Sequence, residues 1–155
     1  MGYTHYWYRP KEIPAEVFEK IVVDFKMISI KIDRRVELRE YDGRGYPTIE
    51  KNEVRFNGNI RSDNSCESFN FPQIIEAGEP ESRDGKYFDF CNTEMKPYDL
   101  AVCVFLIIAK YYIGKELVVS SDGRFDNEWL PAFKIIAEHL DYSDYKTKEG
   151  FELND

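Results

Sequence analysis

Residues 96–114 read KPYDLAVCVFLIIAKYYIG and contain the longest apolar run of the chain, LAVCVFLIIA. A helix that is apolar on all sides is buried over most of its surface. Pro97 suits the first turn of a helix, Asp99 favours a helix N-terminus electrostatically, and Gly114 suits a helix end. The segment therefore predicts a largely buried helix over residues 97–113, against which the rest of the chain packs.

Two amphipathic helices are predicted on either side of this segment in the sequence. Pro14 suits a first turn, and apolar residues then recur every three or four positions as Phe18, Ile21, Val22, Phe25, Ile28 and Ile32. The same spacing in residues 126–140 places Trp129, Phe133, Ile136 and Leu140 on one face. Each of these apolar faces is expected to pack on the core.

Short strands are predicted where β-branched and aromatic residues alternate with polar ones. They are expected at residues 5–9, 36–38, 48–49, 54–60, 66–71, 86–90 and 116–121, the last as an inner strand. Asn57-Gly58 favours a tight hairpin turn within the fourth of these segments. Clustered strands followed by helices favour an α+β fold. We predict a single α+β domain over residues 1–142, with a mixed or antiparallel sheet and about three packed helices, and a polar C-terminal tail over residues 143–155.

The composition argues against several classes of function. The 155 residues include 21 Lys and Arg against 29 Asp and Glu, a net charge of −8, which opposes non-specific binding to nucleic acid. Cys66, Cys91 and Cys103 form neither a disulfide framework nor a zinc-binding spacing. The longest apolar run is about half a membrane span, and the first residues lack the apolar core of a signal peptide. We expect a cytoplasmic protein with reduced thiols and no membrane association.

The N-terminal segment GYTHYWYRP, residues 2–10, is the first candidate site. Alternate residues of a strand share a face, so Tyr3, His5, Trp7 and Arg9 are expected on one side. Aromatic rings and a guanidinium suit a nucleobase stacked on a ring with its phosphate bound by Arg9. The alternative is a core strand whose aromatic rings pack under the first helix, with Arg9 in solvent.

Two further segments are candidates for the same site. In FCNTEMKPYD, residues 90–99, a helix N-terminus with Lys96 beside it favours an anion, although Asp99 opposes one. In SSDG, residues 120–123, Ser120 and Asp122 follow an apolar strand, where sites often form in sheet proteins. Ordinary capping and turn chemistry is the alternative for the first segment, and a plain turn is the favoured interpretation of the second. The predicted ligand-binding residues are Tyr3, His5, Trp7, Arg9, Lys96, Ser120 and Asp122.

Catalytic residues are not identified by the sequence. Cys66 would be a nucleophile if His5 lay beside it, although cysteines are more often small buried apolar residues. Asp89, Asp99 and Asp122 would suit a metal-dependent nuclease if they converged, but their spacing does not require it. The phosphate-binding, dinucleotide-binding, zinc-protease and serine-hydrolase motifs are absent from the sequence. We predict no cofactor and no metal site.

Five short segments carry a resemblance to a known group of proteins. They are GYTHYW at 2–7, FNG at 56–58, CESF at 66–69, KPYD at 96–99 and SSDG at 120–123. With them, residues 2–140 resemble small, mostly uncharacterised proteins of phages and phage-like bacterial regions, and GYTHYW is the most specific element. The resemblance implies an intracellular phage accessory protein, one that counters host defence for example. It assigns no residue a role.

Three functions remain open from the sequence. The first is binding of a small anionic, nucleotide-like ligand, which would interfere with host defence signalling. The second is an enzyme, a hydrolase or phosphodiesterase, acting on such a ligand with His5 as acid or base and Cys66 or Asp122 assisting. The third is an inhibitor that binds a host protein through an acidic, aromatic surface. A homo-oligomer is compatible with each.

A structural observation separates these functions. A deep pocket lined by Tyr3, His5, Trp7 and Arg9 favours a ligand, whereas a flat exposed patch favours a protein partner.

Overall fold

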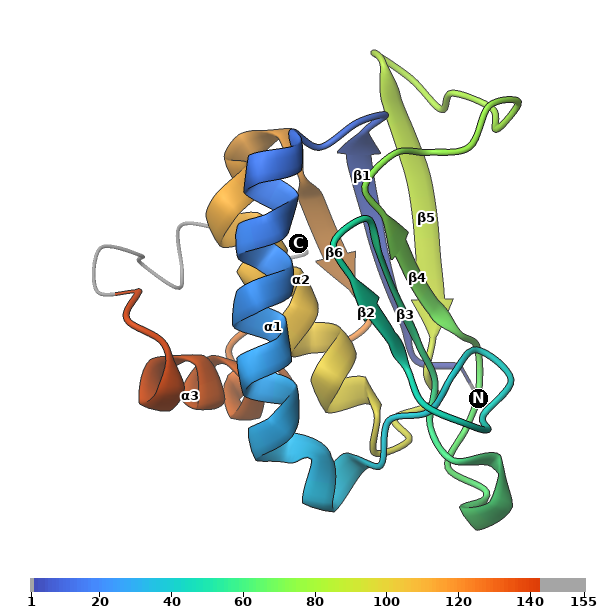
Figure 1. Cartoon of the computed structure of the whole chain (residues 1–155), viewed down its shortest axis with the longest axis vertical. Helices are drawn as coiled ribbons and strands as arrows, with labels where there is room; N and C mark the ends of the chain where they lie inside the picture. Colours follow the sequence, from blue (N-terminus) through green and yellow to red (C-terminus); the bar gives the residue numbers. More distant parts are fainter. Residues whose placement is uncertain (1, 143–155) are drawn as a thin grey trace.

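The three helices gather on one side of the molecule and the strands on the other (Figure 1). The structure is a computed structural model that describes residues 2–142, apart from the side chains of residues 33–35. Within these residues, three α-helices and two antiparallel three-stranded sheets form an α+β domain, which confirms the predicted fold class. The predicted tail, residues 143–155, lies outside the described residues.

The elements follow one another in the predicted order. The helices are α1 (Ala15–Val36), α2 (Asp99–Ile113) and α3 (Leu130–His139), and short 3-10 turns lie at Ile60–Ser62 and Gly114–Glu116. The strands are β1 (Thr4–Pro10), β2 (Thr48–Glu50), β3 (Glu53–Phe56), β4 (Phe69–Pro72), β5 (Lys86–Asn92) and β6 (Val118–Ser121).

Strand β1 lies at the centre of the first sheet, between β5 and β6. Its residues alternate between buried and partly exposed along the strand, as the pleat of a strand requires. His5, Trp7 and Arg9 face inward and are at most 1% exposed. The predicted inner strand β6 is instead an edge strand, because within the described residues it pairs with β1 alone.

The second sheet, in the order β2-β3-β4, contributes the aromatic part of the core. Val54, Phe56, Phe69 and Phe71 point from β3 and β4 into the interior and are fully buried. The Phe69 ring lies 5.3 Å from the Trp7 ring and 5.1 Å from that of Phe105, centroid to centroid. These contacts join both sheets and helix α2 in one core.

Helix α2 is buried as the sequence predicts. Every residue from Ala101 to Ala109 is buried, and the helix packs against both α1 and α3. The helix starts two residues after Pro97 and ends at Gly114, whose φ of +79° is one that residues with a side chain rarely adopt. Among the described residues, no helix combines the length and the apolar character that crossing a membrane requires.

The strand predicted at residues 36–38 is wrong. Val36 is the last residue of α1, and the chain then turns at Glu37, which has a φ of +49°. Arg39 makes an isolated β-bridge with Asn57. The β-branched Val36 fits a helix here because its side chain is buried in the core, and such burial overrides a weak local preference.

The hairpin turn predicted at Asn57-Gly58 is also wrong. Residues 57–68 connect β3 to β4, and the tight β2–β3 turn lies at residues 51–52. Asn57 organises the connection: its Nδ2 donates to Cys66 O at 2.8 Å, and its Oδ1 accepts from Cys66 N at 3.1 Å. A Cβ at Gly58 would lie 1.8 Å from Asn64 O, so glycine serves close backbone approach rather than a positive φ.

Candidate functional site

Four segments meet at one end of the first sheet. They are the start of β1, the end of β6, the residues after β5 and the first turns of α2. His5 lies among them with no exposed surface. Its Nδ1 is 2.7 Å from Ser121 Oγ, and its Nε2 is 2.6 Å from Asp99 Oδ1. We call His5, Thr93, Asp99, Cys103 and Ser121 the His5 cluster.

The contacts of Ser121 indicate which tautomer His5 adopts. Ser121 Oγ accepts hydrogen bonds from Trp129 Nε1 at 3.0 Å and from Gly123 N at 2.9 Å. These two donors use the lone pairs of the hydroxyl, so its own proton points at His5 Nδ1. The imidazole proton then lies on Nε2 and is donated to Asp99. A neutral His5 is thereby bonded at both ring nitrogens.

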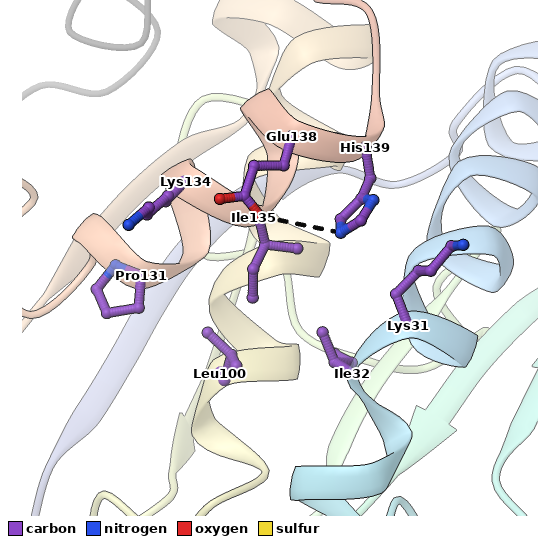
Figure 2. Close-up of a pocket in the computed structure, with 8 residues that line it drawn as sticks. All are labelled: Lys31, Ile32, Leu100, Pro131, Lys134, Ile135, Glu138 and His139. Carbon is purple, nitrogen blue, oxygen red and sulfur yellow. Dashed lines mark ion pairs between the residues drawn. The ribbon is translucent and has the colours of Figure 1, made fainter.

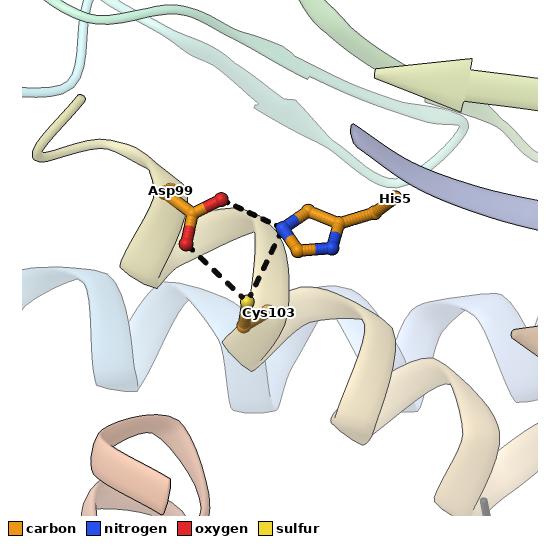
Figure 3. A group of neighbouring side chains, drawn as sticks. All are labelled: His5, Asp99 and Cys103. Carbon is orange, nitrogen blue, oxygen red and sulfur yellow. Dashed lines mark hydrogen bonds and ion pairs between the residues drawn. The ribbon is translucent and has the colours of Figure 1, made fainter. Parts of the chain in front are cut away.

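Two consecutive turns of α2 present Asp99 and Cys103 to His5 (Figure 3). Cys103 Sγ lies 3.6 Å from His5 Nε2 and 3.7 Å from Asp99 Oδ2. Thr93 Oγ1 donates to Asp99 Oδ1 at 2.6 Å. Burial first, and then the negative charge of Asp99, raises the pKa of the Cys103 thiol. The Asp99 side chain is 18% exposed, so solvent reaches the cluster beside this carboxylate.

Tyr3 closes the cluster on another side. Its ring meets the His5 ring edge to face, with centroids 5.2 Å apart. The Tyr3 hydroxyl is buried and has no hydrogen-bond partner among the described residues. Burial and then the charge of Asp99 raise the pKa of Tyr3. A Cβ at Gly123 would lie 1.9 Å from this hydroxyl, so the glycine leaves room for it.

Of the seven predicted ligand-binding residues only His5 belongs to the cluster and Tyr3 borders it; Trp7, Arg9, Lys96, Ser120 and Asp122 lie outside it. Asp122 accepts from Thr4 N at 2.9 Å, and Ser120 sits opposite Tyr6 on the other face of the sheet. Lys96 Nζ donates to the backbone oxygen of Asp63 at 2.9 Å. The structure thus joins His5 to both candidate segments, but through Asp99 and Ser121 rather than through the predicted ligand-binding residues of those segments.

Trp7 is part of the hydrophobic core. It is 1% exposed, and its ring packs against Phe69 and Phe71 of β4. Its Nε1 is buried without a hydrogen-bond partner among the described residues. No face of the indole is open for a stacked base, which matches the core alternative weighed for this strand.

Arg9 is buried, whereas the core alternative expected its side chain to be in solvent. Its guanidinium lies 4.4 Å from the Phe71 ring centroid and donates to the backbone oxygens of Pro10, Pro72 and Gln73. Burial lowers the pKa of Arg9 to about 10, although the negative charge of Asp89 acts in the opposite direction. A pocket of about 390 Å³ adjoins Arg9, lined also by Arg55, Glu53, Glu76, Glu79 and Asp89. Its carboxylates outnumber its guanidinium groups, which disfavours a phosphate there.

The solvent face of the first sheet carries a group of aromatic rings. We call Tyr6, Tyr8, Phe88, Phe90 and Val118 the outer aromatic face. Phe88, Phe90 and Val118 are 43%, 48% and 45% exposed. Tyr6 lies opposite Phe90 and Tyr8 opposite Phe88 in the strand register. The rings contact one another, with the Tyr8 and Phe88 centroids 5.0 Å apart. This face is an extended apolar surface of the kind that marks an interaction site.

A second pocket, of about 270 Å³, lies between the three helices (Figure 2). Ile32, Leu100 and Ile135 form apolar walls. Lys31, Lys134, Glu138 and His139 supply its charged and titratable groups, with Glu138 Oε2 4.0 Å from His139 Nε2. Two lysines against one carboxylate give this pocket a positive charge within an acidic protein.

The structure does not place Cys66 beside His5, as a nucleophile would require. It also does not bring Asp89, Asp99 and Asp122 together at one site. Cys103, not Cys66, lies beside His5; Cys66 Sγ donates to Glu94 Oε1 at 3.4 Å. Asp89 sits opposite Trp7, halfway along β1, whereas Asp99 contacts His5 and Asp122 contacts Thr4. Asp89 is therefore separated from the other two aspartates, which contact neighbouring residues at the start of β1.

Cys103 is the functional candidate that the sequence-based prediction missed, and Asp99 was considered only as a nuclease carboxylate and as a residue opposing an anion, never as a partner of His5 or Cys103. Their spacing of four residues within a helix was the available signal, because residues i and i+4 share a helix face. Their association with His5 could not be recognised, because His5 is 94 residues from Asp99 in the sequence and no motif links the two. The chain matches no protein-family model, no curated protein and no solved structure.

Proposed function

We propose that this protein is an interaction module that binds a partner protein through its outer aromatic face. One observation carries the proposal: Phe88, Phe90 and Val118 are large apolar side chains, each more than two-fifths exposed, on one continuous sheet surface. Buried apolar residues are ordinary, but clustered exposed ones are costly to solubility and mark binding surfaces. Aromatic residues are also enriched at the centres of protein interfaces.

The shape and charge of this face favour a protein over a nucleotide. The rings stand on a sheet surface, whereas a small ligand needs a concave site that surrounds it. Arg83 lies over the Tyr8 ring, with its guanidinium carbon 5.0 Å from the ring centroid. Lys86, at the start of β5, is paired with Glu116. Phosphate groups would therefore meet little positive charge here.

The chemistry of the partner follows from the border of the face. Exposed acids lie in the segments next to its strands: Glu81 and Asp84 shortly before β5, and Asp122 directly after β6. Together with the net charge of −8, this border favours a partner with an apolar centre and a basic rim. A second copy of the chain would bring like charges together, which opposes self-association.

The resemblance to phage proteins supplies a setting for this proposal. A small acidic protein that covers a basic surface of a host protein would act as an inhibitor, in the cytoplasm of the host cell. Cys66, Cys91 and Cys103 are unpaired, which agrees with a reducing compartment.

Phe90→Ser is expected to weaken partner binding strongly while the fold persists. Bacterial lysate is passed over the immobilised wild type, Phe90→Ser and Tyr46→Ser, the last being a matched control because Tyr46 is 90% exposed on a different loop. A captured protein is then purified and titrated. Losing a central aromatic contact costs about 2 kcal/mol or more, roughly 30-fold in affinity. Tyr46→Ser is expected to bind like the wild type, and affinity is expected to fall with added salt.

Three results would contradict the proposal. The first is a purified partner that binds Phe90→Ser as tightly as it binds the wild type. The second is that the wild type captures no partner at all. The third is a wild-type dimer in sedimentation experiments that Phe90→Ser dissociates, because the face would then join two copies of the chain.

The pocket between the helices supports a second candidate function, binding of a small anionic ligand. Lys31 and Lys134 stand at the rim of apolar walls, and such a site suits an anion with an apolar ring. Calorimetry with mono-, di- and cyclic nucleotides is the test. Lys134→Glu is expected to remove any heat of binding, whereas Lys115→Glu, an exposed control outside the pocket, leaves it unchanged. Absence of heat with the wild type excludes this candidate for these ligands.

A further inference from the structure

We propose that His5, Asp99 and Cys103 bind one zinc ion. One ligand atom from each residue lies within 4.8 Å of the other two (Figure 3). The three atoms are an imidazole nitrogen, a carboxylate oxygen and a thiol sulfur, and zinc is the metal that commonly binds this mixture. The inference is independent of the outer aromatic face, which lies on the opposite side of the sheet.

The distances between the side chains already approach those of a zinc site. With Zn–N near 2.0–2.1 Å and Zn–S near 2.3 Å, a tetrahedral ion separates the two atoms by about 3.6 Å. Cys103 Sγ lies 3.6 Å from His5 Nε2 and 3.7 Å from Asp99 Oδ2. The contact between His5 Nε2 and Asp99 Oδ1 is shorter, at 2.6 Å, because it is a hydrogen bond. Zinc would take the place of the proton in that hydrogen bond, and His5 and Asp99 would have to move apart slightly.

Neighbouring hydroxyls hold two of the three ligands in place. Ser121 Oγ contacts the other ring nitrogen of His5 at 2.7 Å, and Thr93 Oγ1 contacts Oδ1 of Asp99 at 2.6 Å. Metal-binding histidines and carboxylates normally have such outer partners, which fix ring and carboxylate orientation. Because Thr93 engages Oδ1, Oδ2 remains directed toward Cys103.

The charges of the site balance on binding. Cys103 loses its thiol proton to solvent, and the ring proton of His5 moves from Nε2 to Nδ1, facing Ser121 Oγ. Ser121 Oγ then accepts from His5 in place of one of its two present donors, Trp129 Nε1 or Gly123 N, and turns its own hydroxyl proton toward the buried Tyr3 oxygen. One thiolate, one carboxylate and a neutral imidazole cancel the two charges of Zn²⁺. A buried site of zero net charge avoids the cost of an uncompensated ion.

Three protein ligands leave a fourth coordination position for water. This ligand count is typical of catalytic zinc sites, whereas structural sites use four protein ligands. Solvent has access beside Asp99, the side chain of which is 18% exposed.

Cobalt titration tests the site directly, because a thiolate bound to Co²⁺ gives an intense near-ultraviolet charge-transfer absorption. The wild type is expected to show this band with one equivalent of Co²⁺, to lose it when Zn²⁺ is added, and to melt at a higher temperature with zinc. Cys103→Ser removes the band, and Asp99→Asn weakens zinc affinity at least 10-fold. Cys66→Ser is the matched control, because its thiol bonds Glu94 outside the cluster, and it should behave like the wild type.

The wild-type spectrum alone can overturn the proposal, whatever the variants do. Absence of the charge-transfer band at stoichiometric cobalt excludes a thiolate-ligated site. A band that persists in Cys103→Ser and disappears in Cys66→Ser places the metal elsewhere. Zinc that leaves the melting temperature of the wild type unchanged likewise contradicts a site formed by the native fold.

Discussion

Leu106→Asp is expected to leave the chain unfolded. Leu106 is fully buried at the centre of α2, within a run of nine buried residues. A carboxylate there would replace a fully buried apolar side chain, and transfer of an unpaired charge into such surroundings costs several kcal/mol or more. A domain of this size has a total stability of about 5–15 kcal/mol, so this single change removes much or all of it.

Circular dichroism and urea denaturation measure the outcome. The variant is expected to lack a cooperative transition, or to be found in the insoluble fraction. Ile30→Asp is the control, since it places the same charge on a helical isoleucine that is 74% exposed. Its midpoint should stay near that of the wild type, because surface substitutions usually change stability by about 0.5 kcal/mol or less. A soluble Leu106→Asp protein that unfolds cooperatively would mean that α2 is not the core helix.

The helices could be predicted from the sequence because their apolar spacing is unambiguous. The apolar run of α2 and the face of α1 each exceed what a strand of ordinary length contains. The division of the strands between two sheets could not be predicted. It depends on pairings between residues far apart in the chain, such as Trp7 with Asp89 and Val119. Local patterns carry no information about such partners.

The candidate site was predictable in part. Strand alternation correctly places His5, Trp7 and Arg9 on one face, but it leaves undetermined whether that face meets solvent or core. The aromatic and charged character of these three residues suggested a site open to solvent. In the structure they face the core, and Tyr6 and Tyr8, at the alternate positions, face solvent. The second sheet decides the matter, because Phe69 and Phe71 pack over Trp7.

Arg9→Ala is expected to destabilise the fold strongly, instead of weakening ligand binding in an intact protein as the sequence alone suggests. The Arg9 side chain connects the two sheets: it leaves β1 and donates to the Pro72 and Gln73 oxygens at the end of β4, at 2.5 and 2.9 Å. Removing it takes a donor from the partly buried Pro72 oxygen, leaves the Gln73 oxygen with only its bond from Ile13 N, and opens a space beside Phe71. It also removes the cation facing Asp89, whose pKa burial already raises. Breaking a buried, hydrogen-bonded charge costs about 3–5 kcal/mol.

Arg9→Lys distinguishes geometry from charge in this prediction. Lysine keeps the positive charge but lacks the planar fork, so it cannot reach Pro10, Pro72 and Gln73 together. We expect a loss of about 1–3 kcal/mol, between the wild type and Arg9→Ala, from the unsatisfied carbonyls. Urea denaturation of the wild type, Arg9→Ala and Arg9→Lys measures the effect. Arg124→Ala is the control, because Arg124 is mostly exposed in an ion pair with Asp126. Its loss should leave the midpoint of unfolding unchanged. If Arg9→Ala unfolds at the wild-type midpoint, Arg9 does not hold the sheets together, and its guanidinium becomes available for the ligand role that the sequence suggested.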